Sequence, residues 1–170
     1  GSVRGKTIGL LGLTFKPNTD DMREAPSIDI IRFLQDQGAT IRAFDPAGKE
    51  AAREVIENVT LLADPYAVAE GADALVIVTE WDAFRALDFG RLKPLMTAPV
   101  LVDLRNVYRP EEAERHGFRY SSIGRAVAEA MAGRFAEIVR TASLSVQAAL
   151  AAGAITPDQI GAAVAAATAA

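Results

Sequence analysis

The chain has 170 residues, half of them apolar, with a formal net charge of −4, no cysteine and one histidine. This length fits one domain of ordinary size with a sizeable core, and the mildly acidic balance excludes a general nucleic-acid-binding surface. The sequence also excludes disulfides, thiolate metal sites and histidine-rich metal sites, and no apolar run approaches the ~20 residues of a membrane span.

Apolar and amphipathic runs alternate from residue 6 to residue 122. The first run, 6–13, is apolar throughout, as expected of a parallel strand that is buried on both faces. The second, 27–37, has the spacing of a helix that begins near Pro26 and ends at Gly38. The other predicted elements are strands at 39–44, 59–61, 74–79, 100–104 and 118–122, and helices or helical turns at 49–57, 65–70, 80–86, 88–95 and 110–116.

This alternation predicts βαβ units with right-handed crossovers. We therefore expect an α/β fold: a Rossmann-like, doubly wound, mainly parallel sheet of about five or six strands. The dinucleotide fingerprint G-x-G-x-x-G is absent, because the position three after Gly12 is Phe15. The first loop is thus not built to hold a dinucleotide in the usual way.

The composition changes after residue 125, where alanine becomes dominant. Apolar spacing predicts a helix over about 125–152, a break at Gly153 and a second helix from Thr156 to about Ala167. We expect two parts, a domain at 3–125 and an alanine-rich helical tail at 126–170. The tail's role is predicted to be structural.

The first tail helix has an apolar stripe that needs cover. It either folds back on the sheet or pairs with its copy in a second chain. We favour the second, which predicts a homo-oligomer and first of all a dimer, because small residues allow helices to approach closely. These residues are Ala128, Ala132, Gly133 and Ala136.

The loop between the first strand and the first helix carries Lys16, Arg23 and three acids. Ligands of open α/β sheets bind at such loops, and the following helix points unpaired N–H groups toward the loop. We predict an anion site here, with a diphosphate as the favoured anion. The alternative, two solvated cations in weak surface pairs with the acids, stays open on spacing alone.

Arg105 and Asn106 follow the strand at 100–104. Arg105 is either an anion ligand or a charged loop residue paired with Asp103, and Asn106 is a weaker candidate. Asp45 ends the second strand, where an acid often meets a ribose, but Asp45-Pro46 is more typical of a turn. Trp81 either stacks on a base or, as we favour, packs against the rim of the sheet.

His116 is interpreted as a surface residue or a partner of a helix C-terminus. Ser143 and Ser145 have no neighbouring base and are not candidates for a nucleophile. We therefore name no catalytic residue and no metal ligand.

The first loop, GLTFKPNTDDMRE at 12–24, closely resembles the first loop of the C-terminal, UDP-binding domain of the UDP-glucose/GDP-mannose dehydrogenase family. The UDP-glucose 6-dehydrogenase branch is the best match. Further matches follow in the family's order: FDP at 44–46, TEW at 79–81 and DLRN at 103–106. The resemblance covers about residues 3–125 and does not extend over 126–170.

The resemblance implies roles for four residues. Lys16 would contact the nucleotide-sugar, Phe15 would lie along it, and Arg105 would bind its UDP part across a subunit boundary in a dimer. Arg23 would reach NAD, which a domain upstream of this chain would hold. The parent enzyme would be a cytoplasmic oxidoreductase that makes UDP-glucuronate from UDP-glucose in two NAD-linked steps, through a thioester on a cysteine.

Because this chain has no cysteine, we expect an isolated UDP-binding domain that is inactive by itself. The abrupt start, after a Gly1-Ser2 that we interpret as a cloning remnant, is typical of a domain cut from a longer chain. Two alternatives remain: a domain of a UDP-N-acetylmannosamine or GDP-mannose dehydrogenase, and a non-catalytic assembly module whose nucleotide site is vestigial.

Overall fold

The structure, a computed structural model, describes residues 2–123. Its strands are β1 (Thr7–Leu11), β2 (Thr40–Phe44), β3 (Val59–Leu61), β4 (Ala74–Ile77), β5 (Val100–Asp103) and β6 (Arg119–Ser122). Its helices are α1 (Pro26–Asp36), α2 (Lys49–Val55), α3 (Pro65–Ala69), α4 (Asp82–Arg85), α5 (Phe89–Leu92) and α6 (Pro110–Arg115), with a 3-10 helix η1 (Lys93–Leu95) after α5.

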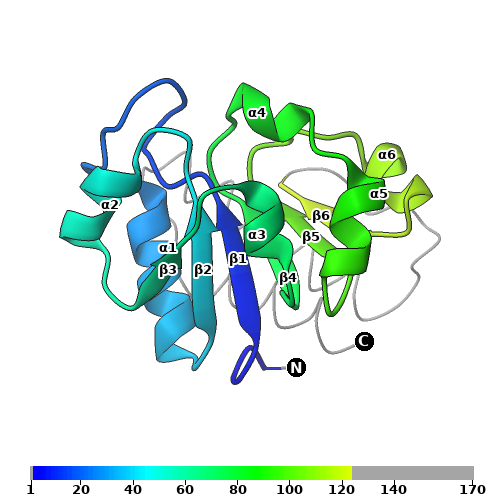
Figure 1. Ribbon diagram of the computed structural model, residues 1–170, viewed down its shortest axis with the longest axis horizontal. Helices are drawn as coiled ribbons and strands as arrows, with labels where there is room; N and C mark the ends of the chain where they lie inside the picture. Colours follow the sequence, from blue (N-terminus) through cyan, green and yellow to red (C-terminus); the bar gives the residue numbers. More distant parts are fainter. Residues whose placement is uncertain (1, 124–170) are drawn as a thin grey trace.

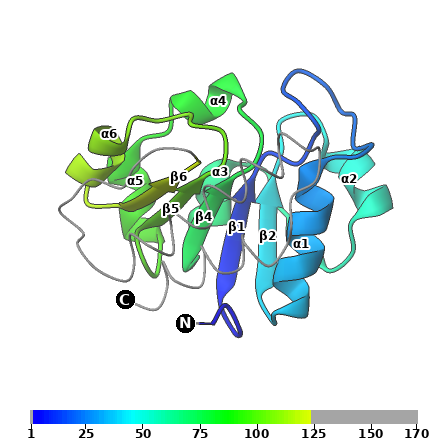
Figure 2. The same cartoon turned by 180° about the vertical axis from the view of Figure 1, so that it is seen from behind.

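The strands form one sheet in the order β3-β2-β1-β4-β5-β6, and every pairing in it is parallel. The chain starts at β1, builds outward to β3, crosses back to β4 and continues to β6 (Figure 1). Right-handed crossovers place α1 and α2 on one face and α3 to α6 on the other (Figure 2). The predicted doubly wound, Rossmann-like α/β fold is confirmed, with six strands.

The central strands are buried on both faces, so their side chains alternate between two apolar layers. Leu10, Val76 and Val102 belong to the layer that contains the buried side of α1. Leu75 and Leu101 belong to the other layer, together with buried side chains of α3 to α6. This arrangement explains why the strands read as continuous apolar runs in the sequence.

Most elements are shorter than predicted, and the local backbone at the carboxyl edge of the sheet explains two of these differences. Strand β1 ends at Leu11 rather than at residue 13, because the N–H groups of Leu13 and Thr14 donate to Asp45 instead of to a neighbouring strand. Helix α4 begins only at Asp82, because Trp81 before it has an extended backbone.

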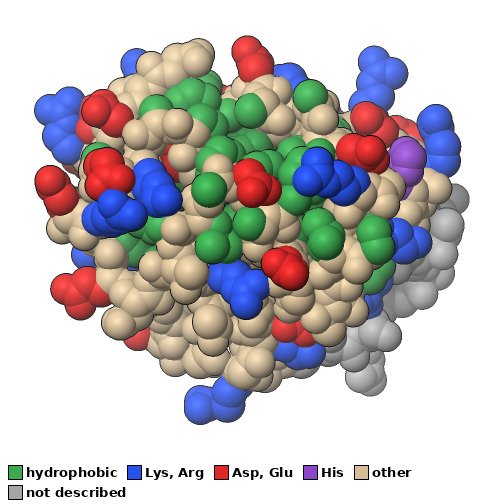
Figure 3. All heavy atoms as spheres, viewed as in Figure 1, with side chains coloured by type: hydrophobic (Ala, Val, Ile, Leu, Met, Phe, Trp, Pro, Cys, Tyr) green, Lys and Arg blue, Asp and Glu red, His purple; other side chains and the backbone are tan. Residues whose placement is uncertain are grey.

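The helical tail predicted for 126–170 lies outside the described residues, as does the proposed pairing of that tail with a second copy. Within residues 2–123, no helix is both long and apolar enough to cross a membrane. On the face that carries α3 and α5, acidic and basic side chains are interspersed around apolar ones (Figure 3).

Candidate functional site

The loops that follow β1, β2, β4 and β5 meet at one edge of the sheet, because the carboxyl ends of parallel strands lie together. The chain reverses its direction of winding between β1 and β4, which are neighbours in the sheet. Crevices at such switch points are where open α/β sheets bind ligands. The loop 12–25 after β1 forms part of this upper edge in Figure 1.

The buried carboxylate of Asp45, only 3% exposed, organises this edge. Its Oδ2 accepts hydrogen bonds from the backbone N–H groups of Leu13 (2.7 Å) and Thr14 (3.2 Å) and from the Thr14 hydroxyl (3.2 Å). Its Oδ1 accepts from the N–H groups of Ala47 (2.9 Å) and Gly48 (2.7 Å). One side chain thus fixes the first loop to the turn after β2.

The turn predicted at Asp45-Pro46 is confirmed by the two bonds to Oδ1. The bonds to both carboxylate oxygens argue against the alternative, a ribose contact, because Oδ1 and Oδ2 are already occupied by protein donors. Sequence reasoning missed the longer-range part of this network. The available signal was that Thr14, Asp45 and Trp81 each follow the end of a strand.

Trp81 packs into the rim, as favoured from the sequence, and is 8% exposed. Its indole Nε1 donates to Oδ2 of Asp45 over 3.2 Å. With its ring buried in this way, Trp81 presents no open face on which a base could stack. Through this bond it ties the end of β4 to the end of β2.

Gly12 lets the first loop pass very close to β4. Its φ is +87°, in the region that favours glycine. A Cβ atom at this position would lie 2.6 Å from Cβ of Thr79 and 2.7 Å from its backbone nitrogen. The Thr79 hydroxyl also donates to the carbonyl of Thr14 over 2.7 Å. Glycine is therefore required where the two strand ends meet.

The fixed part of the loop presents Phe15 and Lys16 to solvent. Phe15 is 50% exposed, although it is a large apolar residue, and Lys16 is exposed as well. The backbone around them is held by a bond from the Phe15 N–H to the Asp21 carbonyl (2.9 Å) and by one from the Thr14 hydroxyl to the Lys16 carbonyl (3.1 Å). Two exposed side chains therefore project from a hydrogen-bonded loop.

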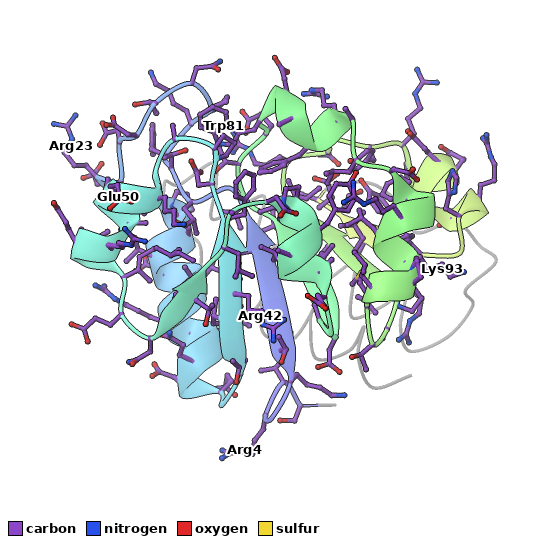
Figure 4. The ribbon with its side chains drawn as sticks, viewed as in Figure 1. Arg4, Arg23, Arg42, Glu50, Trp81 and Lys93 are labelled. Carbon is purple, nitrogen blue, oxygen red and sulfur yellow. The ribbon has the colours of Figure 1, made fainter. Side chains whose placement is uncertain are left out.

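Arg23 is engaged with a neighbour inside the same loop. Its guanidinium forms two hydrogen bonds with Asp21, Nε to Oδ1 at 2.9 Å and Nη2 to Oδ2 at 2.7 Å. These bonds lower the pKa of Asp21 to about 2, with a smaller contribution from Lys16. The Arg23 side chain is 88% exposed and extends outward from the domain in Figure 4, so it faces solvent rather than the sheet.

No side chain caps the first turn of α1, because its N-cap residue is Ala25. Ser27, in the first turn of α1, is fully buried and donates its hydroxyl to the carbonyl of Leu13. The start of α1 is thereby fastened to the beginning of the loop that follows β1, and the positive dipole end of α1 lies at the same edge of the sheet.

Arg105 is paired, but not with the residue considered from the sequence. Its guanidinium binds the Glu80 carboxylate in a two-pronged pair, with Nη2 2.7 Å from Oε1 and Nε bonded to Oε2. The Arg105 hydrogen bonds lower the pKa of Glu80. The alternative, a pair between the Arg105 side chain and Asp103, is wrong. Asp103 accepts a hydrogen bond from the backbone N–H of Arg105 (3.0 Å) but none from its guanidinium.

Asp103 instead anchors the loop that carries Arg105. It also accepts the N–H of Tyr108 at 3.1 Å and the hydroxyl of Tyr120 at 2.8 Å. Asn106, next in the chain, has φ of 54° and donates its Nδ2 to the carbonyl of Ile123 (3.0 Å). Its Oδ1 is buried and has no hydrogen-bond partner among the described residues.

His116 lies just after α6, exposed, with its ring 5.6 Å from that of Phe89. This agrees with its interpretation as a surface residue.

The four predicted site residues belong to loops on one edge of the sheet, but they do not form one cluster of contacts. Lys16 and Phe15 face solvent, Arg23 holds Asp21, and Arg105 holds Glu80. The arrangement offers cations and an aromatic face to an anionic ligand.

Comparison with known proteins assigns the family. Residues 9–110 match the UDP binding domain of the UDP-glucose/GDP-mannose dehydrogenase family. The chain is 59% identical over 125 residues to UDP-glucose 6-dehydrogenase of Rhizobium meliloti (strain 1021), which covers 74% of the chain and 29% of that protein. It is 45% identical over 126 residues to UDP-glucose 6-dehydrogenase of Bacillus subtilis (strain 168), and the match covers 74% of this chain and 27% of that protein.

Solved structures agree with this assignment. A UDP-glucose dehydrogenase of Pyrobaculum islandicum superposes with a TM-score of 0.58 at 37% identity, over 66% of this chain and 24% of that one. A UDP-D-ManNAc dehydrogenase of Pyrococcus horikoshii superposes with a TM-score of 0.59 at 26% identity, over 73% of this chain and 27% of that one. The chain thus spans less than a third of the length of these relatives. It belongs to the UDP-glucose/GDP-mannose dehydrogenase family, and residues 9–110 correspond to that family's UDP binding domain.

Proposed function

We propose that the chain supplies the nucleotide half of the substrate site of a UDP-glucose 6-dehydrogenase-like enzyme. The observation that carries this proposal is the Asp45 network, which fixes the loop of Phe15 and Lys16 at the switch point of the sheet. Such a site suits a diphosphate, because the exposed Lys16 and the start of α1 lie at the same edge of the sheet. The identity to proteins named UDP-glucose 6-dehydrogenase favours UDP-glucose over UDP-N-acetylmannosamine or GDP-mannose.

Each predicted residue has a distinct role in this proposal. Lys16 neutralises a phosphate, and Phe15 covers one side of the bound nucleotide-sugar. Arg105 binds the UDP part, and its planar fork, which now holds Glu80, suits a pyrophosphate equally well. That Arg105 binds the ligand of a partner subunit stays a prediction, as does the homo-oligomer itself.

NAD is the cofactor that the proposed oxidation requires. The first loop of this domain does not fit a dinucleotide, because Phe15 occupies the place of the third fingerprint glycine and Gly12 lies against Thr79. We therefore assign to NAD only an edge contact from the exposed Arg23, with the rest held by a part of the longer protein outside this chain. A location in the cytoplasm also stays a prediction.

A nucleotide titration monitored by amide NMR spectra tests this function. UDP should shift the amide signals of residues 13–16 and 104–106, while β3, at the far side of the sheet, stays unchanged. GDP should cause smaller shifts at the same concentration, because the proposal assigns the site to the uridine nucleotide. If UDP shifts no signals at millimolar concentration, the assembly-module alternative is favoured. If GDP binds better, the chain belongs with the GDP-mannose enzymes.

A further inference from the structure

The segment 79–81, which follows β4, holds three loops of the carboxyl edge with three consecutive side chains. Its first residue, Thr79, binds the loop after β1, and its last, Trp81, binds the turn after β2. Its middle residue, Glu80, binds the guanidinium of Arg105 in the loop after β5. The segment therefore connects the loop of the first candidate cation of the site with the loop of the second.

The pair between Glu80 and Arg105 uses only one edge of the guanidinium. Nε and Nη2 of Arg105 donate to the two carboxylate oxygens, and the two side chains are 30% and 29% exposed. Within residues 2–123, Nη1 of Arg105 has no hydrogen-bond partner. Because arginine carries its donors in a planar fork, a guanidinium held by one edge can still bind an oxyanion by another.

Glu80 has good reason to keep Arg105 when a ligand arrives. The hydrogen bonds from Arg105, and to a lesser extent the positive charge of Arg85, lower the pKa of Glu80, so its carboxylate is ionised at neutral pH. Without Arg105, this partly buried charge would lose its partner. Arg85 does not replace it, since its Nε lies 3.5 Å from Asp82 and its Nη1 donates to the carbonyl of Val107 (3.4 Å).

We infer that Glu80 is a positioning residue, which holds Arg105 by the Nε–Nη2 edge and leaves the Nη1 edge free to bind a phosphate oxygen of a diphosphate. This inference rests on the proposed function, because it takes Arg105 as a ligand of the diphosphate. A guanidinium that is fixed before the ligand arrives loses less side-chain freedom on binding. Glu80 thereby favours binding through Arg105, although its own charge repels the ligand.

Calorimetric titrations of inorganic pyrophosphate and of UDP into the full chain test this inference. Glu80→Ala should weaken the binding of either ligand by roughly 3- to 10-fold, because the freed Arg105 side chain must then be ordered on binding. Glu80→Gln should restore part of the affinity, because its amide oxygen still accepts one bond from the guanidinium. In an Arg105→Ala background, Glu80→Ala should cause no further loss, since no guanidinium remains to be positioned.

The matched control is Asp73→Ala. Asp73 is also a partly buried acid in an ion pair, with Lys6 at 3.0 Å, but it lies just before β4, at the opposite end of the sheet. This variant should bind both ligands like the parent chain. A loss of affinity equal to that of Glu80→Ala would assign the effect to the removal of any ion pair, and would overturn the inference.

The Nε–H signal of Arg105 in ¹⁵N spectra of the parent chain gives a second measurement, which needs no variant. In mildly acidic solution this proton should exchange slowly with water, because Glu80 accepts its hydrogen bond. The slow exchange should persist at saturating pyrophosphate if the pair stays intact in the complex. Fast exchange in the complex would mean that the ligand displaces Glu80, and would overturn the inference.

The two ligands separate a failure of this inference from a failure of the proposed function. If UDP binds and Glu80→Ala binds it equally well or more tightly, or if the loss persists in the Arg105→Ala background, only the inference is overturned. If pyrophosphate shows the expected pattern but UDP does not bind, the proposed function fails and the positioning role of Glu80 is supported. No binding of either ligand at millimolar concentration would overturn both.

Discussion

The indole of Trp81 donates a hydrogen bond to Oδ2 of Asp45 over 3.2 Å, and so joins the end of β4 to the end of β2 across β1, which lies between them. The loop after β1 is bound to the same oxygen through Leu13 and Thr14. Three strand ends therefore share one buried carboxylate. This is how a loop of small and polar residues becomes a fixed support for Phe15 and Lys16.

Replacing Asp45 should destabilise the domain strongly. Asp45→Ala leaves the N–H groups of Leu13, Thr14, Ala47 and Gly48 and the indole of Trp81 without their acceptor. Since each buried donor without a partner costs about 1–3 kcal/mol, and some will find water, we expect a loss of roughly 3–5 kcal/mol in the free energy of unfolding. Urea denaturation measures this loss.

The matched control for that experiment is Asp64→Ala. Asp64 also accepts two backbone N–H groups, those of Tyr66 and Ala67, but it is exposed at the start of α3. Loss of this cap should cost only about 0.5–2 kcal/mol. Equal losses for the two variants would mean that Asp45 is an ordinary turn residue.

Gly12 should tolerate alanine less well than another glycine with positive φ. Gly12→Ala combines the unfavourable φ of +87° with a Cβ 2.6 Å from Thr79, and the backbone of Thr79 cannot move away easily. Gly71→Ala has a φ of +68° but no atom within 4 Å of the new Cβ. We expect Gly71→Ala to lower the free energy of unfolding by about 1–2 kcal/mol. Gly12→Ala should lower it by a further ~1–3 kcal/mol. Similar unfolding free energies for the two would contradict the close approach of the strand ends.

The Arg105–Glu80 pair makes the stability of the domain depend on pH. The pKa of Glu80 lies below its ordinary value of 4.5 because Arg105 hydrogen-bonds the carboxylate. A lowered pKa in the folded state stabilises the fold above the unfolded-state pKa, and this contribution is lost as the pH falls through the folded-state value. The parent chain should therefore be more stable than Glu80→Gln at neutral pH. This difference in unfolding free energy should shrink as the pH falls and disappear in acid.

A ¹³C NMR titration of the Glu80 carboxyl checks the cause of this shift. Arg105→Gln should return the pKa of Glu80 toward 4.5. Arg53→Gln, which removes a cation from a pair with Glu50 on α2, should leave the Glu80 titration unchanged. A Glu80 pKa that stays low without Arg105 would assign the shift to another neighbour.

The chain alone should not oxidise a nucleotide-sugar. The thioester step proposed for the parent enzyme needs a thiolate, and the sequence contains no cysteine. Incubation with UDP-glucose and NAD should therefore produce no NADH absorbance. Turnover that persists through further purification steps would contradict the assignment of this chain to one half of the active site.

Much of the fold could be predicted because its signals are local. Apolar runs such as 74–79 identify strands, and Gly38 marks the end of α1, so the order of strands and helices follows from the sequence. The position of the site also follows, since Lys16 and Arg105 come directly after strands. The ion-pair partner of Arg105 could not be predicted from the sequence. Arg105 binds Glu80, which lies 25 residues earlier in the chain at the end of a neighbouring strand. Asp45 likewise draws its donors from three loops that only the folded sheet brings together.

The central claim is that the loop fixed by Asp45 binds the diphosphate of UDP through Lys16, and calorimetric titration of UDP into the chain and its variants tests it most directly. We expect the parent chain to bind with a Kd on the order of 0.1–1 mM, or roughly −4 to −5.5 kcal/mol. Lys16→Ala should lose a charge-assisted bond and weaken binding by roughly 1.5–3 kcal/mol. Lys93→Ala, which removes the same charge from η1 before β5, should bind like the parent (Figure 4). Equal affinities of the Lys16→Ala variant and the parent chain would contradict the claim.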